Sequence, residues 1–149
     1  PTDFVLAIDK SLTQSTPTAL SVARHSLAAT TVGNYALFAG GAISNGYSGV
    51  VDAYNASLTR STPTNIGVAS QLAATSLEGY ALFGGGIQAR GRLSTVYAYD
   101  ESLTRSTPTA LSVARNSLAA ATVGNYAIFA GGQTGTSTYS NVAEAYTVS

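Results

Sequence analysis

The sequence predicts an all-β fold that is built from repeats. The segment 11–41 (SLTQSTPTALSVARHSLAATTVGNYALFAGG) returns at 102–132 with four substitutions, and a looser copy lies at 57–86. Prolines recur at steps of 46 and 45 residues, at Pro17, Pro63 and Pro108. A period of this length, made of short apolar runs and turns, is typical of propellers and solenoids.

Each repeat contains four short segments that favour strands, separated by residues that favour turns. In the first repeat we expect strands at 27–32, 35–39, 50–54 and 58–62. The first is rich in small residues, which suits the crowded centre of a propeller, and the second is apolar on both faces, which suits burial. The fourth is polar and ends at a proline, so we expect it at an outer edge.

Three features of the repeat follow one another in a fixed order. A diglycine follows the second strand, a tyrosine lies in the third, and an arginine precedes the first, at Gly40-Gly41, Gly85-Gly86, Gly131-Gly132, Tyr54, Tyr99, Tyr146, Arg24 and Arg115. This pattern resembles the kelch repeat over nearly the whole chain. The chain departs from it where the kelch tryptophan is absent from the fourth strand and where Ser70 aligns with the arginines. The resemblance implies four-stranded propeller blades.

We therefore predict one repeat domain over 1–149, with blades at about 21–64, 67–109 and 112–149 and with strands in 3–20 completing the last blade. Propellers close with about 4 to 8 blades, so three blades form a half-propeller that a homodimer completes to six. Segment 12–18 of another chain would supply the missing outer strand. Two alternatives stay open: the chain is a piece of a longer protein, or the exchange continues into a polymer.

Composition bounds the partners. Only 9% of residues are charged and the net charge is zero, so we expect no nucleic-acid partner. No apolar run reaches the length of a membrane span, and we expect no membrane partner. A surface made polar by Ser, Thr, Asn, Gln and Tyr favours an extracellular or virion-exposed location.

No catalytic motif is found in the sequence. There is no cysteine, His25 is the only histidine, and the carboxylates are scattered. An oxidase or sialidase type of enzyme is the alternative considered, but no matching set of arginines accompanies the single histidine. We expect no enzyme activity, no cofactor and no metal site.

The remaining candidates for function are loop residues. We expect the loops between the second and third strands, and the segments before each first strand, to emerge on one face. The candidate ligand-binding residues there are Arg24, His25, Asn45, Tyr47, Gln71, Gln88, Arg90, Arg92, Arg115, Asn116, Thr136 and Tyr139. Such side chains suit a glycan or protein ligand. The predicted function is a non-catalytic binding or scaffolding module that self-associates by strand exchange, with a carbohydrate-binding propeller or a structural polymer as alternatives.

Overall fold

The computed structural model describes all residues from 1 to 149, and its regular structure consists of strands only, which confirms the all-β prediction. The strands are β1 (Ala7–Ile8), β2 (Gln14–Ser15), β3 (Ala28–Val32), β4 (Tyr35–Ala39), β5 (Ala42–Ile43), β6 (Gly46–Tyr47), β7 (Val51–Tyr54), β8 (Arg60–Ser61), β9 (Ala73–Leu77), β10 (Tyr80–Gly84), β11 (Ile87–Gln88), β12 (Gly91–Arg92), β13 (Val96–Asp100), β14 (Arg105–Ser106), β15 (Ala119–Val123), β16 (Tyr126–Ala130) and β17 (Ala143–Tyr146). No helix long and apolar enough to cross a membrane is present.

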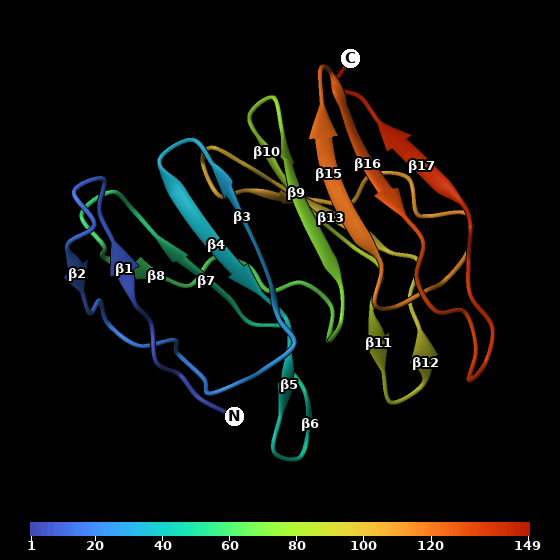
Figure 1. The fold of residues 1–149 in the computed structure, drawn as a ribbon, viewed down its shortest axis with the longest axis horizontal. Helices are drawn as coiled ribbons and strands as arrows, with labels where there is room; N and C mark the ends of the chain where they lie inside the picture. Colours follow the sequence, from blue (N-terminus) through green and yellow to red (C-terminus); the bar gives the residue numbers. More distant parts are fainter.

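Three antiparallel sheets lie side by side along the molecule (Figure 1). The first sheet has the strand order β3-β4-β7-β8, the second has the order β9-β10-β13-β14, and the third contains only β15-β16-β17. Strands β3 and β15 both lie against β9, so the first strand of each sheet faces the next sheet along. We refer to these sheets as the first, second and third sheets.

The hydrophobic core lies between the sheets. One cluster of 12 buried residues joins the first and second sheets and includes Leu37, Val51 and Phe83. A second cluster of 9 buried residues joins the second and third sheets and includes Leu82 and Phe129. Strand β10 of the second sheet lies between the first and third sheets, and its residues 81–84 are all buried. In the outer sheets, β4 and β16 are fully buried only at alternate residues, because a single sheet covers one face of each.

The strands of the repeat match the sequence predictions closely. The expected strand at 35–39 is confirmed, and those at 27–32 and 50–54 each begin one residue later. The expected strand at 58–62 pairs only at Arg60 and Ser61. Leu58 has a positive φ of 60°, which places it in the turn before β8 and shortens the strand.

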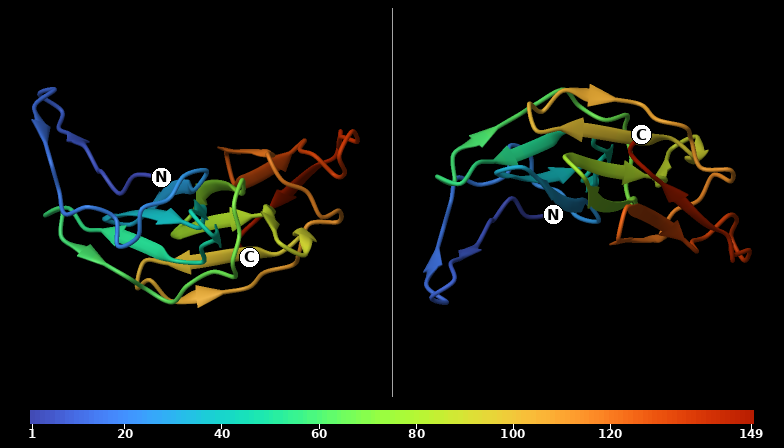
Figure 2. Two further views of the ribbon diagram at one scale, coloured as in Figure 1. Left: turned by 90° about the horizontal axis from the view of Figure 1, so that it is seen from below. Right: turned by 90° about the horizontal axis from the view of Figure 1, so that it is seen from above.

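The two ends of the fold differ. At the N-terminal end, β1 and β2 pair Ala7 with Ser15 and Ile8 with Gln14, and this hairpin stands away from the three sheets (Figure 2). Strands β7 and β8 pair with the same register, Ala53 with Ser61 and Tyr54 with Arg60. At the C-terminal end, the third sheet has no strand that corresponds to β8 or β14.

The middle repeat is offset by one residue from the alignment made on sequence. Isolated bridges pair His25 with Ala42, Ser70 with Ile87, and Asn116 with Gln133. Ser70 therefore corresponds to His25, and Ala69 occupies the position of the arginines, so the alignment of Ser70 with Arg24 and Arg115 was wrong. The middle repeat is one residue shorter before its first strand, which no turn signal in the sequence reveals.

Candidate functional site

Two sets of loops lie on one face, as predicted. The hairpins β5–β6 and β11–β12 and the loop 133–141 extend from the same end of the sheets (Figure 1). The residues before each first strand pair with the bases of these loops through the bridges at His25, Ser70 and Asn116. We call this surface, formed by residues 42–47, 87–92 and 133–141, the loop face.

A polar network crosses the loop face between the second and third repeats. Arg92 Nε donates to Asn116 Oδ1 at 2.7 Å, and Asn116 Nδ2 donates to Gln71 Oε1 at 2.6 Å. The Ser117 hydroxyl donates to the same Gln71 oxygen at 3.0 Å. Three of the predicted residues, Gln71, Arg92 and Asn116, are thus brought together, and the side chain of Asn116 is buried within the network.

The other loop residues are separate from one another. Tyr139 is 75% exposed, and His25 makes a side-chain contact of 2.9 Å between Nδ1 and the Ser26 hydroxyl. The remaining predicted residues are exposed or half-buried, and their own side chains take part in no hydrogen bond; they are Asn45, Tyr47, Gln88, Arg90 and Thr136. Gln133 Nε2 donates to the backbone carbonyl of Thr136. The side chains of these predicted residues are the ones available to a ligand on the loop face.

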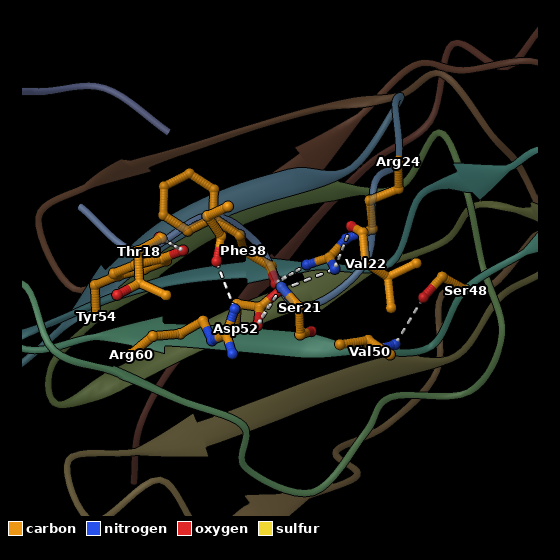
Figure 3. A network of polar contacts seen from close by, with 11 residues as sticks. Thr18, Ser21, Val22, Arg24, Phe38, Ser48, Val50, Asp52, Tyr54 and Arg60 are labelled. Atoms are coloured by element: carbon orange, nitrogen blue, oxygen red, sulfur yellow. Dashed lines mark hydrogen bonds and ion pairs between the residues drawn. The ribbon is translucent and has the colours of Figure 1, made fainter. Parts of the chain in front are cut away.

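Arg24 does not lie on the loop face, so the prediction that it contacts a ligand there is corrected. Its side chain is buried under the first sheet, where Nη1 lies 2.9 Å from Asp52 Oδ2 and Nη2 donates to the Phe38 carbonyl at 3.0 Å (Figure 3). Arg60 Nε lies 3.7 Å from Asp52 Oδ1 on the other side of the carboxylate. The ion pair joins the segment before β3 to strand β7.

The prediction that Arg115 contacts a ligand on the loop face is corrected in the same way. It is fully buried, with Nη2 2.8 Å from Glu144 Oε2 and Nη1 donating to the Val142 carbonyl at 3.1 Å. In the second sheet the pair is replaced as a unit by Ala69 and Tyr97. One sequence signal could have shown this: Asp52 and Glu144 occur only in the repeats that also carry the arginine.

The tyrosines of the third strands hold the preceding segment in place. The hydroxyl of Tyr54 donates to the Thr18 carbonyl at 2.8 Å, Tyr146 donates to Thr109 at 2.8 Å, and Tyr99 donates to Thr64. Burial raises the pKa of all three hydroxyls, and the nearby carboxylates Asp52 and Glu144 raise the pKa of Tyr54 and Tyr146 further. These tyrosines stay protonated and serve as hydrogen-bond donors.

The structure contains no group of three or more His, Cys, Asp or Glu side chains placed to hold a metal ion. The charged residues that do come together are the ion pairs of the first and third sheets.

No family model matches the sequence, and no curated protein matches it either. Solved structures are similar to it in fold. The structure of YjhT has a TM-score of 0.82 and 14% identity over 98% of this chain, and the match covers 50% of that chain. The present chain therefore spans about half the length of that protein chain. At this identity the likeness concerns the fold, which is an all-β, propeller-like arrangement of antiparallel sheets.

Proposed function

We propose that this protein is a non-catalytic β-propeller binding or scaffolding module with three kelch-like blades per chain. Two chains form a six-bladed ring, in which the third sheet of each chain gains its fourth strand from the other. The observation that carries this proposal is the match between the two ends. The third sheet lacks a fourth strand, while β2 carries the register of a fourth strand outside any of the three sheets.

Hydrogen bonds between successive repeats support the proposal. Gly41 N–H donates to the Ala69 carbonyl at 2.7 Å, and Gly86 N–H donates to the Arg115 carbonyl at 2.8 Å. The next member of this series is Gly132 N–H, which has no acceptor within the chain. The carbonyl of Arg24 in a second copy is the equivalent acceptor, so a second copy continues the series in the same geometry.

An exposed apolar face at the end of the third sheet supports it as well. Val123 is 63% exposed and Tyr126 is 52% exposed, whereas Val32 and Leu77, at the position of Val123 in the other sheets, are 4% and 3% exposed. Each of the inner positions is covered by the sheet that follows. The first sheet of a second copy would cover Val123 and Tyr126 in the same way.

The mass in solution tests the proposal. Native mass spectrometry over a range of concentrations should give a species at twice the chain mass of 15.1 kDa. A monomer at every concentration would contradict the ring. A broad series of higher masses would also contradict ring closure and would favour the structural polymer, in which each chain donates its strand to the next.

A glycan-binding role is the second candidate, and the exposure of Tyr139 on the loop face favours it. Aromatic side chains with neighbouring amide and guanidinium groups stack on and hydrogen-bond to sugars. A glycan array should show binding that Tyr139→Ala or Tyr47→Ala abolishes. Asn34→Ala, in the turn at the opposite end of the first sheet, is the matched control. Binding that survives both tyrosine substitutions would exclude this site.

A further inference from the structure

The turn before each fourth strand presents a leucine in one fixed way. Leu12, Leu58 and Leu103 have positive φ values of 60°, 60° and 62°. In the first of these turns Asp9 Oδ1 accepts hydrogen bonds from Ser11 N–H at 2.8 Å and Thr13 N–H at 2.9 Å. Asn55 and Asp100 accept the same two bonds in the other turns. The three leucines are therefore displayed by the same backbone geometry.

Leu103 shows where this leucine packs between two sheets. Its side chain packs against the buried cluster that contains Val32 and Leu37 of the first sheet, together with Tyr35. The turn lies so close that a Cβ atom at Gly33 would approach Glu101 Cγ within 3.2 Å. A leucine from the second sheet thus completes the interface with the first sheet.

One repeat further on, the same position is an open pocket. Leu77, Tyr80 and Leu82 of the second sheet correspond to Val32, Tyr35 and Leu37. They line a pocket of about 270 Å³, which Tyr146 and the segment 147–149 border on the side of the third sheet. The pocket continues the packed interface between the second and third sheets, and no leucine of this chain fills it.

We propose that Leu12 of a second copy fills this pocket as its strand β2 joins the edge of β17. This inference rests on the proposed self-association and specifies its contact. Leu12 is 84% exposed in the single chain, so it is available to a partner. The registers of the complete sheets place Ser15 opposite Ala145 and Gln14 opposite Tyr146.

Strand β17 keeps its place in this assembly, and β1 is released. Glu144 pairs with the buried Arg115, and the Tyr146 hydroxyl bonds to the Thr109 carbonyl. At the corresponding positions β1 carries Leu6 and Ile8, which would leave the Arg115 charge buried without a carboxylate. Releasing β1 breaks its two residue pairs with β2 and, just before β1, the hydrogen bonds from Leu20 N–H to the Asp3 carbonyl and from Arg24 N–H to the Thr2 carbonyl.

A substitution at Leu12 tests whether this side chain fills the pocket of a second copy. Leu12→Asp should raise the dissociation constant of the dimer about tenfold or more, measured by native mass spectrometry, because an apolar contact is lost. Lys10→Ala, an exposed residue of the same turn, is the matched control and should leave the constant unchanged. Since Leu12 is exposed in the single chain, the variant should unfold at the same urea concentration as the parent monomer. An unchanged dissociation constant in Leu12→Asp would overturn the contact between Leu12 and the pocket but would leave the proposed ring standing.

A peptide tests the contact between Leu12 and the pocket independently of ring formation. A fluorescent peptide of residues 9–17, which keeps the Asp9 carboxylate of the turn, should bind the Leu12→Asp protein, as followed by anisotropy. The same peptide with Leu12→Ala should bind at least about tenfold more weakly. Binding of the parent peptide, together with a parent protein that is monomeric at every concentration, would retain the contact between Leu12 and the pocket and reject the ring. Equal binding of the two peptides, or no binding of either, would overturn the contact between Leu12 and the pocket.

Discussion

Arg24 Nη1 lies 2.9 Å from Asp52 Oδ2, and both side chains are fully buried. The carboxylate also accepts a hydrogen bond from Ser21 N–H at 3.2 Å, and Arg60 lies on its other side. Removing a buried ion from water is costly, and these partners offset that cost. The pair thereby fixes the path of the chain as it enters the first sheet.

Removing Asp52 alone should therefore be damaging. Asp52→Ala leaves Arg24 buried without a counter-ion, and we expect it to lower the free energy of unfolding by about 3 to 5 kcal/mol in urea titrations. The double variant Arg24→Met/Asp52→Leu should lose much less than the sum of the two single variants, because it removes both charges together. Additive losses would show that the two side chains are not coupled.

Gly85 should not tolerate a side chain. It has a φ of 69°, and a Cβ atom there would lie 2.6 Å from the Arg115 carbonyl oxygen. We expect Gly85→Ala to lower the free energy of unfolding by about 3 kcal/mol, from backbone strain and from the separation of the second and third sheets. Gly91→Ala is the control, since Gly91 has a φ of 125° and open space around it. Equal losses at the two glycines would mean that strain alone is responsible.

Gly67 lies against the side chain of Tyr97 in the second sheet. A Cβ atom at Gly67 would meet the Tyr97 hydroxyl at 2.5 Å. Gly67→Ala should therefore cost about 1 kcal/mol of stability, measured in urea, because the tyrosine must shift. Adding Tyr97→Phe should restore most of that loss. A double variant no more stable than Gly67→Ala would contradict the proposed clash.

Stability should fall at alkaline pH. Burial raises the pKa of Tyr99, Tyr146 and Tyr54 above the usual value of 10.0, so the unfolded chain loses these protons more readily than the folded chain. Their contribution to stability is complete below about pH 10 and is lost as pH rises toward the folded pKa values.

Tyr99→Phe should flatten this alkaline decline, as followed by urea midpoints between pH 8 and 11, roughly the range around the tyrosine pKa. At neutral pH the same variant should cost about 1 to 2 kcal/mol, because the Thr64 carbonyl loses its donor. Tyr139→Phe, at an exposed site, should change neither property. An alkaline limb that is the same in Tyr99→Phe and the parent would contradict the assignment.

The sequence predicts the strands well because their signals are local. The run Tyr35–Ala39 is apolar on both faces, and the Gly33-Asn34 turn before it allows a positive φ, which Gly33 adopts at 51°. The small hairpins β5–β6 and β11–β12 were missed, since their two-residue pairings carry no periodicity.

The buried side-chain contacts were harder to predict than the strands. Arg24 and Arg115 read as loop residues because charged side chains are usually exposed, and their burial depends on partners far along the chain, Asp52 and Glu144. The middle repeat is one residue shorter before Ala69, and this also made its alignment on sequence wrong. Only the pairing of Ser70 with Ile87 shows which residues correspond there. Among the loop residues, the sequence correctly placed both loop sets on one face.

The loop face acquires a further property if two chains close into a ring. Each hairpin and the loop with Tyr139 would then occur twice, related by a two-fold axis. A ligand with repeating units, such as a polysaccharide, could engage both copies at once. The second contact would be intramolecular, and the combined avidity could exceed that of one loop by a factor on the order of 10² to 10⁴. Weak contacts by single loop side chains would then be sufficient for tight attachment to a polyvalent surface.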